Sequence, residues 1–438
     1  MITSKKAENV RDVIRYLQKF KNAVVVIYLD DKTIGSTLFS SHIRDIALLH
    51  QTGLKVVLIP GARSRIDEVL NGAGIEWNFH ENVRVTDSDA MPLIKMAAFD
   101  VSNTVMTSLA ANSITAVIGN WVRSRGKGVI NGFDYGTAGE IDKLDVEEIN
   151  TVLNAGIIPI FPCIGWNSSG HPYNISSILL AEQIAVTLKA DKLFFVMQQC
   201  EINEKKYTIP ESFPISEFGQ VSAMTLEQVS EFIKANNAVD DGIKNLLSTA
   251  QKACSSGVTR VHIVDGMIDG VLPCEIFSGL GSGTMVYTGN YGKIRRMTLT
   301  DIPAVLRIMK PFVQTGMLLP RSEILLTQNL QDYIVYEFDG GIHACAALHL
   351  YPDGQAEIAA VAVDENYSHM GIGPQLIDFL IEKAKDESAS SIFIMTTQAA
   401  DWFENLGFEA DDIETLPSER RASWSQERNS KLYRFKKK

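Results

Sequence analysis

The residues whose types and spacing point to chemistry lie in one stretch, residues 357–381, EIAAVAVDENYSHMGIGPQLIDFLI. Glu357 opens a run of small and β-branched residues, which is typical of a strand with a buried face. Gly371 and Gly373 follow in a turn, where glycine permits positive φ and a close approach of backbone to ligand. From Pro374 the apolar residues repeat at helical spacing. Because a loop that opens into a helix offers free N–H groups, the stretch predicts a phosphate-binding turn.

A lone GxG turn before a helix is a weak signal, so its context decides the interpretation. A second strand-like run ends in Met-Thr-Thr at residues 395–397, and residues 402–408 read WFENLGF. The order of strand, GxG turn, helix, strand and a helix ending in FENLGF resembles the GNAT acetyltransferase superfamily. The resemblance implies acetyl-CoA as cosubstrate and no metal.

The elements before this stretch alternate between helices and nearly continuous apolar strands, which predicts a mostly parallel sheet with helices on both faces. The expected strands are residues 23–29, 54–59, 157–163, 192–196 and 258–264. The expected helices are residues 10–20, 40–52, 64–70, 87–111, 146–155 and 176–188. We expect the helix over 87–111 to break near Pro92.

After residue 291 the pattern changes to short strands joined by hairpin-type turns. The expected strands are residues 295–298, 333–338, 343–350 and 356–363, with a helix over 301–309. Together the two patterns predict an α/β first domain over residues 1–288 and an α+β second domain over residues 294–438. Glycine and asparagine loosen the expected linker, residues 289–293.

Composition excludes several classes of function. A net charge of −11 argues against general nucleic-acid binding and against docking on an anionic membrane. Five scattered cysteines without a CxxC pair suit buried thiols in a reducing cytoplasm and no metal site. No run is long enough to span a membrane, and the N-terminus lacks the apolar core of a secretion signal, so we expect a cytoplasmic protein.

The first domain resembles the amino-acid kinase fold, acetylglutamate kinase above all. The matching landmarks are residues 59–63 (IPGAR), 84–86 (RVT), 173–175 (YNI) and 279–284 (GLGSGT). Active members carry a Lys and a Gly-Gly pair after the first strand, whereas residues 28–31 read YLDD and would repel phosphate. The second loop is reduced to PGAR, and the Asp expected after Asn174 is missing. These departures indicate a catalytically silent domain.

A silent kinase fold fused to an acetyltransferase resembles the bacterial-type N-acetylglutamate synthases over essentially the whole chain. Further matching stretches are residues 42–53, 84–87, 344–348, 402–403 and 428–431. The resemblance implies that N-acetyl-L-glutamate is made from acetyl-CoA and L-glutamate, as the first step of arginine biosynthesis. It also implies feedback inhibition by L-arginine and a homo-oligomer, a hexamer.

The acetyl transfer needs a base, because glutamate arrives as an ammonium ion. The family match assigns that role to Glu357; the residue alone would favour a surface or turn glutamate at a strand start. The oxyanion needs a fixed donor, such as a backbone N–H of residues 359–363, where the superfamily bulges the strand. Many relatives place a Tyr at Phe403 to protonate the thiolate. Thr396 or Thr397 could replace it, or could simply end a strand.

The resemblance assigns acetyl-CoA binding to the strand end and the turn: Ala362, Val363, Ser368, His369, Met370, Gly371, Ile372 and Gly373. Most relatives have Arg or Gln at Ser368, so the backbone must supply that phosphate contact here.

Glutamate brings two carboxylates, for which the planar guanidinium of arginine is the expected partner. The family match points to Arg321, Arg428 and Ser430, although other arginines lie close in sequence to Arg428.

For inhibitory arginine, the resemblance points to Glu275 and the loop of residues 277–283, including Gly281, with Tyr16 on the first helix. Glu275 could instead be an ordinary loop glutamate.

Three other functions stay open at this stage. They are an acetyltransferase for another amine, a phosphotransferase, and a non-catalytic sensor of arginine or CoA.

Overall fold

The computed structural model describes residues 14, 20–210, 213–216, 219–239, 242–277, 283–288, 292–338 and 341–436. The chain consists of two compact units, Met1–Gly289 and Asn290–Lys438. The helix expected over residues 10–20 lies outside the described residues except for Ile14 and Phe20. Among the described residues, no helix combines the length and apolar character needed to cross a membrane.

The first unit is built on an eight-stranded sheet in the order β14-β16-β15-β13-β1-β2-β10-β5. Its neighbouring strands run parallel except for β15 and β16, which confirms the predicted mostly parallel sheet. The strands are β1 (Val24–Leu29), β2 (Lys55–Pro60), β5 (Ala116–Ile118), β10 (Ile158–Ile160), β13 (Lys192–Met197), β14 (Ala223–Thr225), β15 (Arg260–Asp265) and β16 (Thr284–Tyr287).

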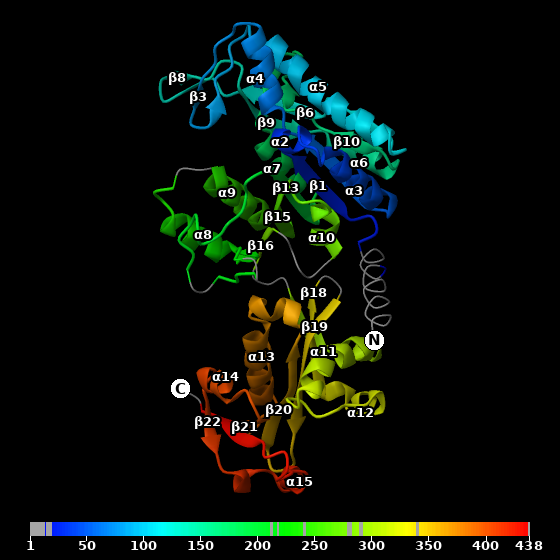
Figure 1. The fold of residues 1–438 in the computed structure, drawn as a ribbon, viewed down its shortest axis with the longest axis vertical. Coiled ribbons are helices and arrows are strands. Elements are labelled where there is room, and N and C mark those ends of the chain that lie inside the picture. The colour runs from blue at the N-terminus through cyan, green and yellow to red at the C-terminus, as the bar shows by residue number, and fades with distance from the viewer. Residues whose placement is uncertain are drawn as a thin grey trace. The chain divides into compact units, whose positions relative to one another are not determined.

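Helices cover both faces of this sheet (Figure 1). Successive residues of each strand point to opposite sides, and because both sets are apolar, both faces must be covered. In β1, Val25, Ile27 and Leu29 pack on one face with helices α3, α5 and α10, whereas Val26 and Tyr28 pack on the other with α6, α7, α8 and α9. The helices are α3 (Phe39–Gln51), α5 (Met91–Ala110), α6 (Val146–Asn154), α7 (Ser177–Thr187), α8 (Leu226–Ala235), α9 (Gly242–Ser255) and α10 (Val271–Phe277).

Two sequence predictions fail in this unit. The helix expected over 87–111 is not broken near Pro92: α5 begins at Met91, and Pro92 fits its first turn, where a backbone N–H needs no partner. The strand expected over 157–163 ends at Ile160, and the chain then enters a separate sheet, β12-β11-β6-β9.

The remaining elements of the unit are α4 (Arg63–Gly72), which confirms the helix expected over residues 64–70, and short segments that carry no strong periodic signal. The short segments are α2 (Asp31–Ile34), β3 (Phe79–His80), β4 (Val83–Arg84), β6 (Val122–Gly126), β7 (Val129–Ile130), β8 (Phe133–Asp134), β9 (Gly139–Leu144), β11 (Ile164–Trp166) and β12 (Pro172–Asn174).

The second unit is built on a seven-stranded sheet in the order β17-β18-β19-β20-β21-β23-β22. The first four strands form the predicted antiparallel meander, and β20 then pairs in parallel with β21. The strands are β17 (Lys293–Arg296), β18 (Tyr333–Phe338), β19 (Gly341–Leu350), β20 (Gln355–Val363), β21 (Ser391–Thr396), β22 (Phe408–Asp411) and β23 (Lys431–Phe435).

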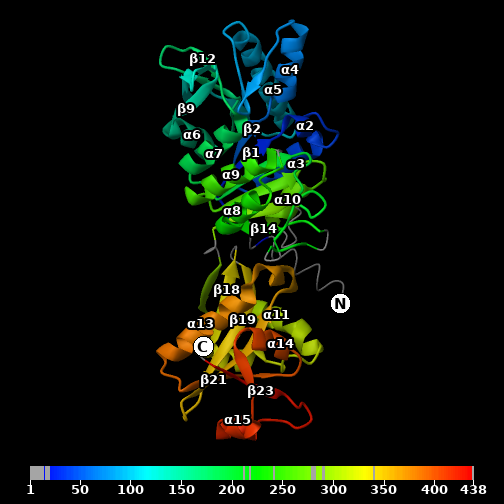
Figure 2. The same ribbon diagram turned by 90° about the vertical axis from the view of Figure 1, so that its left-hand side faces the viewer.

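Helices lie on both sides of the second sheet: α11 and α12 on one side and α13 on the other (Figures 1 and 2). The α-helices are α11 (Ile302–Gln314), α12 (Glu323–Gln328), α13 (Ile372–Asp386), α14 (Ala400–Asn405) and α15 (Ser418–Ala422). Short 3-10 turns complete the unit: η1 (Leu299–Asp301), η2 (Leu330–Asp332), η3 (Glu365–Met370) and η4 (Ile413–Thr415). This mixed architecture confirms the predicted fold class.

Candidate active site

Strands β20 and β21 separate at the point where the sequence predicts chemistry. β20 runs to Val363, but its ladder with β21 ends at Ile358. Just beyond, Ala360 has φ of 53°, in the left-handed region that residues with side chains rarely adopt. The pairing of β20 with β19 shifts register at the same place. Such a bulge bends a strand, so β20 turns away from β21 and leaves backbone groups unpaired between them.

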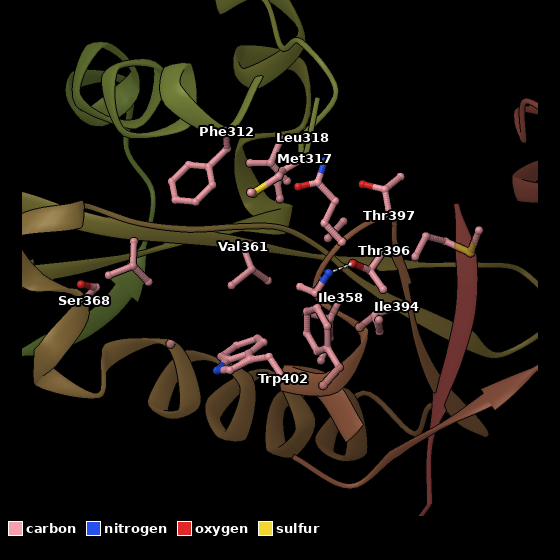
Figure 3. Close-up of a pocket in the computed structure, with 18 of the residues that line it drawn as sticks. Phe312, Met317, Leu318, Ile358, Val361, Ser368, Ile394, Thr396, Thr397 and Trp402 are labelled. Atoms are coloured by element: carbon pink, nitrogen blue, oxygen red, sulfur yellow. Dashed lines mark hydrogen bonds between the residues drawn. The ribbon is translucent and has the colours of Figure 1, made fainter. Parts of the chain in front are cut away.

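A cavity of about 400 Å³ opens where the two strands diverge. Figure 3 shows Phe312, Met317 and Leu318 on one side and Trp402 on the other, with Val361 between them. The wall is therefore mainly apolar, while the bulged strand offers backbone amides along it. A slot of this kind suits an extended chain that carries its own amide groups.

The turn predicted to bind phosphate lies at one end of this cavity. Val363, Ser368 and Gly373 line the cavity, and Gly371 adopts φ of 64° directly before α13. Gly373 must stay small, because a Cβ there would lie 2.9 Å from the Trp402 ring.

The other residues expected to bind acetyl-CoA are placed differently. Ile372 is the buried first residue of α13, and Ala362 packs into the apolar cluster beneath α11. The backbones of His369 and Met370 lie in η3, and their side chains fall outside the described part of the chain.

Glu357 is not a surface residue. Its side chain is nearly buried, at 6% exposure, and Arg420 Nε donates to both of its carboxylate oxygens, at 3.0 and 2.8 Å. The Tyr351 hydroxyl donates to Glu357 Oε2 at 2.7 Å. Glu357 itself does not line the cavity, but the next residue, Ile358, does. Neither partner was predicted from the sequence. Arg420 is one of several arginines in this part of the chain, and its local sequence does not distinguish it from the others.

Three arginines, Arg321, Arg420 and Arg428, lie close to one another, and Arg428 contacts a residue of the cavity wall. Arg428 Nη2 donates to the carbonyl of Met317, a cavity residue, at 2.9 Å. Arg321 Nε donates to the Tyr333 hydroxyl at 3.2 Å. Burial, and then the positive charges of Arg321 and Arg420, lower the pKa of Arg428. The mutual repulsion of these guanidinium groups would be relieved by bound carboxylates.

Ser430 lies directly before β23 and is buried. Its carbonyl oxygen accepts a hydrogen bond from Trp424 Nε1 at 3.1 Å, which fixes the backbone of the segment that carries Arg428.

The two threonines at the end of β21 differ in their contacts. Thr396 Oγ1 accepts a hydrogen bond from the Ala399 N–H at 3.0 Å (Figure 3). The Thr397 hydroxyl is buried and has no hydrogen-bond partner within the described residues. Both side chains line the cavity. Thr397 is thus the threonine whose hydroxyl has no described partner, whereas Thr396 keeps its own O–H as a possible donor.

In the first unit, Glu275 lies in helix α10 and not in a loop. Its side chain is buried between His262 Nδ1, 2.8 Å from Oε1, and the Gly283 N–H, which donates to Oε2 at 3.3 Å. Burial lowers the pKa of His262 to about 4, despite the nearby carboxylate. Tyr16 and Gly281 lie outside the described residues.

Acidic groups follow β1, at the loop that the sequence predicts to have lost phosphate binding. The Asp31 carboxylate accepts hydrogen bonds from both the N–H and the hydroxyl of Ser64, in the first turn of α4. Burial, and next the hydrogen bond and charge of Asp31, raise the pKa of Asp30 to about 7. A carboxylate therefore occupies the helix N-terminus that would otherwise attract an anion.

The cysteines are mostly buried. Cys274 is exposed, which corrects the expectation that the thiols are buried; the other four cysteines are buried. Within the described ranges, no three His, Cys, Asp or Glu side chains are grouped to hold a metal ion.

Comparison with known proteins covers both units. Residues 25–265 match the amino acid kinase family, and residues 306–408 match the acetyltransferase (GNAT) family. The chain is 32% identical over 446 residues to an amino-acid acetyltransferase of Escherichia coli strain K12, covering 99% of both chains. It is 31% identical to an amino-acid acetyltransferase of Vibrio atlanticus, covering 95% of both.

Solved structures give the same picture. N-acetylglutamate synthase from Neisseria gonorrhoeae, complexed with coenzyme A and L-arginine, superposes with a TM-score of 0.79 at 27% identity over 98% of both chains. The same enzyme complexed with coenzyme A and N-acetyl-glutamate superposes with a TM-score of 0.62 at 28% identity. The likeness therefore extends over both units and not over one domain alone.

Proposed function

The chain belongs to the amino-acid acetyltransferase family of N-acetylglutamate synthases, and from this premise we propose that it makes N-acetyl-L-glutamate from acetyl-CoA and L-glutamate as the first step of arginine biosynthesis. It is an acyltransferase with a GNAT domain, and acetyl-CoA is its cosubstrate. One observation carries the proposal for the substrate: Arg428, whose charge is close to those of Arg321 and Arg420, donates to the carbonyl of Met317, a residue that lines the cavity opened by β20 and β21.

In the proposed reaction, Glu357 takes a proton from the ammonium group of glutamate, and the free amine attacks the thioester carbonyl. A backbone N–H of residues 359–363 stabilises the oxyanion, which is supported by the bulge at Ala360. Collapse of the intermediate breaks the carbon–sulfur bond, and one of the two protons on the attacking nitrogen goes to the departing sulfur, so that an amide and the thiol of CoA are formed. The Thr397 hydroxyl donates a hydrogen bond to the departing thiolate, a role supported by its lack of another partner within the described residues.

The two carboxylates of glutamate are held by Arg321, Arg428 and Ser430 in this proposal. The support is the position of Arg428 on the cavity residue Met317 and the closeness of Arg321 and Arg420. An acceptor without carboxylates, such as a polyamine, would meet like charges here.

We propose further that the kinase-like domain, residues 1–288, is silent as a kinase and binds L-arginine as an allosteric inhibitor. The acidic pair Asp30 and Asp31 supports the loss of phosphate binding. Buried Glu275 would face the guanidinium group, and Tyr16 and Gly281 would complete the site. Inhibition then requires that arginine binds more tightly to a less active arrangement of the enzyme. A hexamer is the expected assembly.

The experiment that tests the substrate is thiol release from acetyl-CoA with a panel of amines. We expect turnover with L-glutamate and little with L-glutamine, L-lysine or spermidine. Comparable rates with a polyamine would favour an acetyltransferase of another specificity. Calorimetric titration with L-arginine, beside an inhibition curve, tests the regulatory site; binding without inhibition would contradict the allosteric proposal.

A further inference from the structure

The second unit contains another cavity, of about 450 Å³, which shares no lining residue with the cavity between β20 and β21. Its wall is rich in charged side chains, unlike the apolar wall of the first. Besides Tyr351, the titratable and charged residues that line it are Arg296, Asp332, His349, Lys383, Glu387 and Glu419. The acetyl transfer described above assigns no role to this polar cavity.

Tyr351 connects the polar cavity to the proposed base. Tyr351 is one of the residues that line that cavity, and its hydroxyl donates to Glu357 Oε2 at 2.7 Å. On the other side, Ile358, the residue after Glu357, lines the cavity for acetyl transfer. Glu357 therefore precedes a lining residue of the first cavity, Ile358, and is hydrogen-bonded to a lining residue of the polar cavity, Tyr351.

A base must lose its proton before the next turnover, and Glu357 has few routes for it. The residue is 5% exposed, and its described hydrogen-bond partners are Arg420 and Tyr351. A guanidinium group donates but cannot accept, so Arg420 cannot take up the proton. A tyrosine hydroxyl both accepts and donates. Burial, and then the charge of Glu357, raise the pKa of Tyr351 well above its usual value of 10, so the hydroxyl stays protonated.

We propose that Tyr351 is a positioning residue that passes the proton from Glu357 to water in the polar cavity, and this proposal rests on the proposed role of Glu357 as base. In the first step the ammonium N–H bond breaks and a Glu357 O–H bond forms. In the second, Glu357 gives its proton to the Tyr351 oxygen while the Tyr351 O–H proton goes to a cavity water. The resulting hydronium ion exchanges with solvent, and the carboxylate and hydroxyl are restored.

The test is Tyr351→Phe in the full-length chain, assayed by glutamate-dependent thiol release. We expect kcat to fall about 10- to 100-fold, in the range of lost proton-transfer assistance, with KM for both substrates within about twofold. We also expect a larger solvent deuterium isotope effect on kcat and partial rescue by a small buffer base. Tyr433→Phe, a buried tyrosine of β23, is the matched control and should behave as the parent.

Leu350→Trp tests the cavity by a second route. Leu350 lines the polar cavity but is exposed, so a larger side chain can displace water there with little effect on the core. We expect a lower kcat at unchanged KM, whereas Phe379→Trp, on exposed α13 surface outside both cavities, should have no effect.

The possible outcomes distinguish a failure of the Tyr351 relay from a failure of the proposed acetyltransferase function. Absence of thiol release by the parent chain would overturn the proposed function itself. An active parent and an inactive Glu357→Gln variant, together with parental kcat and isotope effect in Tyr351→Phe, would overturn the relay alone. Parental kcat in Leu350→Trp would exclude the polar cavity as the exit.

Discussion

Arg420 donates through its Nε to both carboxylate oxygens of Glu357, at 3.0 and 2.8 Å, and so fastens α15 to the start of β20. The two side chains are 16% and 6% exposed. Removing one partner of such a pair leaves the other charge in a poorly solvated place, which costs more than the loss of a surface pair. The pair therefore has consequences for both stability and activity.

For stability, we expect Arg420→Ala to lower the free energy of unfolding by about 2–4 kcal/mol, since Glu357 would keep its charge without a cation. Urea unfolding of the variant measures the change. The neighbouring Arg421→Ala is the control, because its pair with Glu414 is 46% and 77% exposed and should contribute less than about 1 kcal/mol. Equal losses in the two variants would show that burial of the Arg420 pair is unimportant.

For activity, Glu357→Gln keeps the size of the side chain but removes the proton acceptor. We expect kcat to fall by about 10²- to 10⁴-fold, the usual contribution of a positioned base. Thiol release under saturating substrates measures kcat. Glu382→Gln, on the exposed surface of α13, should retain parental kcat. Retention of parental kcat in Glu357→Gln would show that Glu357 is not the general base.

For substrate binding, we expect Arg428→Ala to raise KM for L-glutamate about 10- to 100-fold, because a charge-assisted hydrogen bond to a carboxylate is lost. KM for acetyl-CoA should not change. Arg428→Lys should recover only part of the loss, since a lysine cannot form two parallel hydrogen bonds. If the apparent affinity for glutamate is untouched in Arg428→Ala, the carboxylate assignment is wrong.

The two threonines of the cavity should respond differently to the isosteric change to valine. Thr397→Val removes a hydroxyl that has no partner within the described residues, so we expect a lower kcat with little change in stability. Thr396→Val removes the acceptor for the Ala399 N–H at the start of α14 and should cost about 1 kcal/mol of stability. Kinetics and thermal unfolding of both variants check this division, and the opposite pattern would exchange their roles.

The acidic pair after β1 predicts a pH dependence of stability. The folded state raises the pKa of Asp30 from 3.8 to about 7, so between these values the folded chain binds more protons than the unfolded chain. Stability must therefore fall as pH rises from about 4 to 7 on account of this group. Asp30→Asn should flatten that slope and stabilise the first unit by about 1–3 kcal/mol above pH 7. A steeper slope in the variant would contradict the assignment.

Local sequence patterns predicted five of the eight strands of the first sheet, the meander of the second and the GxG turn before α13. The strands β5, β14 and β16 and the helices α8 and α9 were not predicted. Two-residue strands such as β7 and β8 were not predicted, because two residues carry no period. The partners of Glu357 also escaped: Tyr351 lies six residues away and Arg420 sixty-three, and only the folded sheet brings them together.

The distinction between Thr396 and Thr397 shows the same limit. Both are threonines at the end of the same strand, so the sequence predicted the role of thiolate donor equally for each. What separates them is a single backbone N–H, that of Ala399, which the turn into α14 brings to Thr396.

The central claim is that this chain transfers the acetyl group of acetyl-CoA to the amine of L-glutamate, and one assay tests it most directly. The purified full-length chain is mixed with acetyl-CoA and L-glutamate, free thiol is followed in time, and the amino-acid product is identified by mass spectrometry. The account predicts thiol release that depends on glutamate and matches N-acetylglutamate formed in equal amount. Thiol release without that product, or no release when glutamate is added, would contradict it.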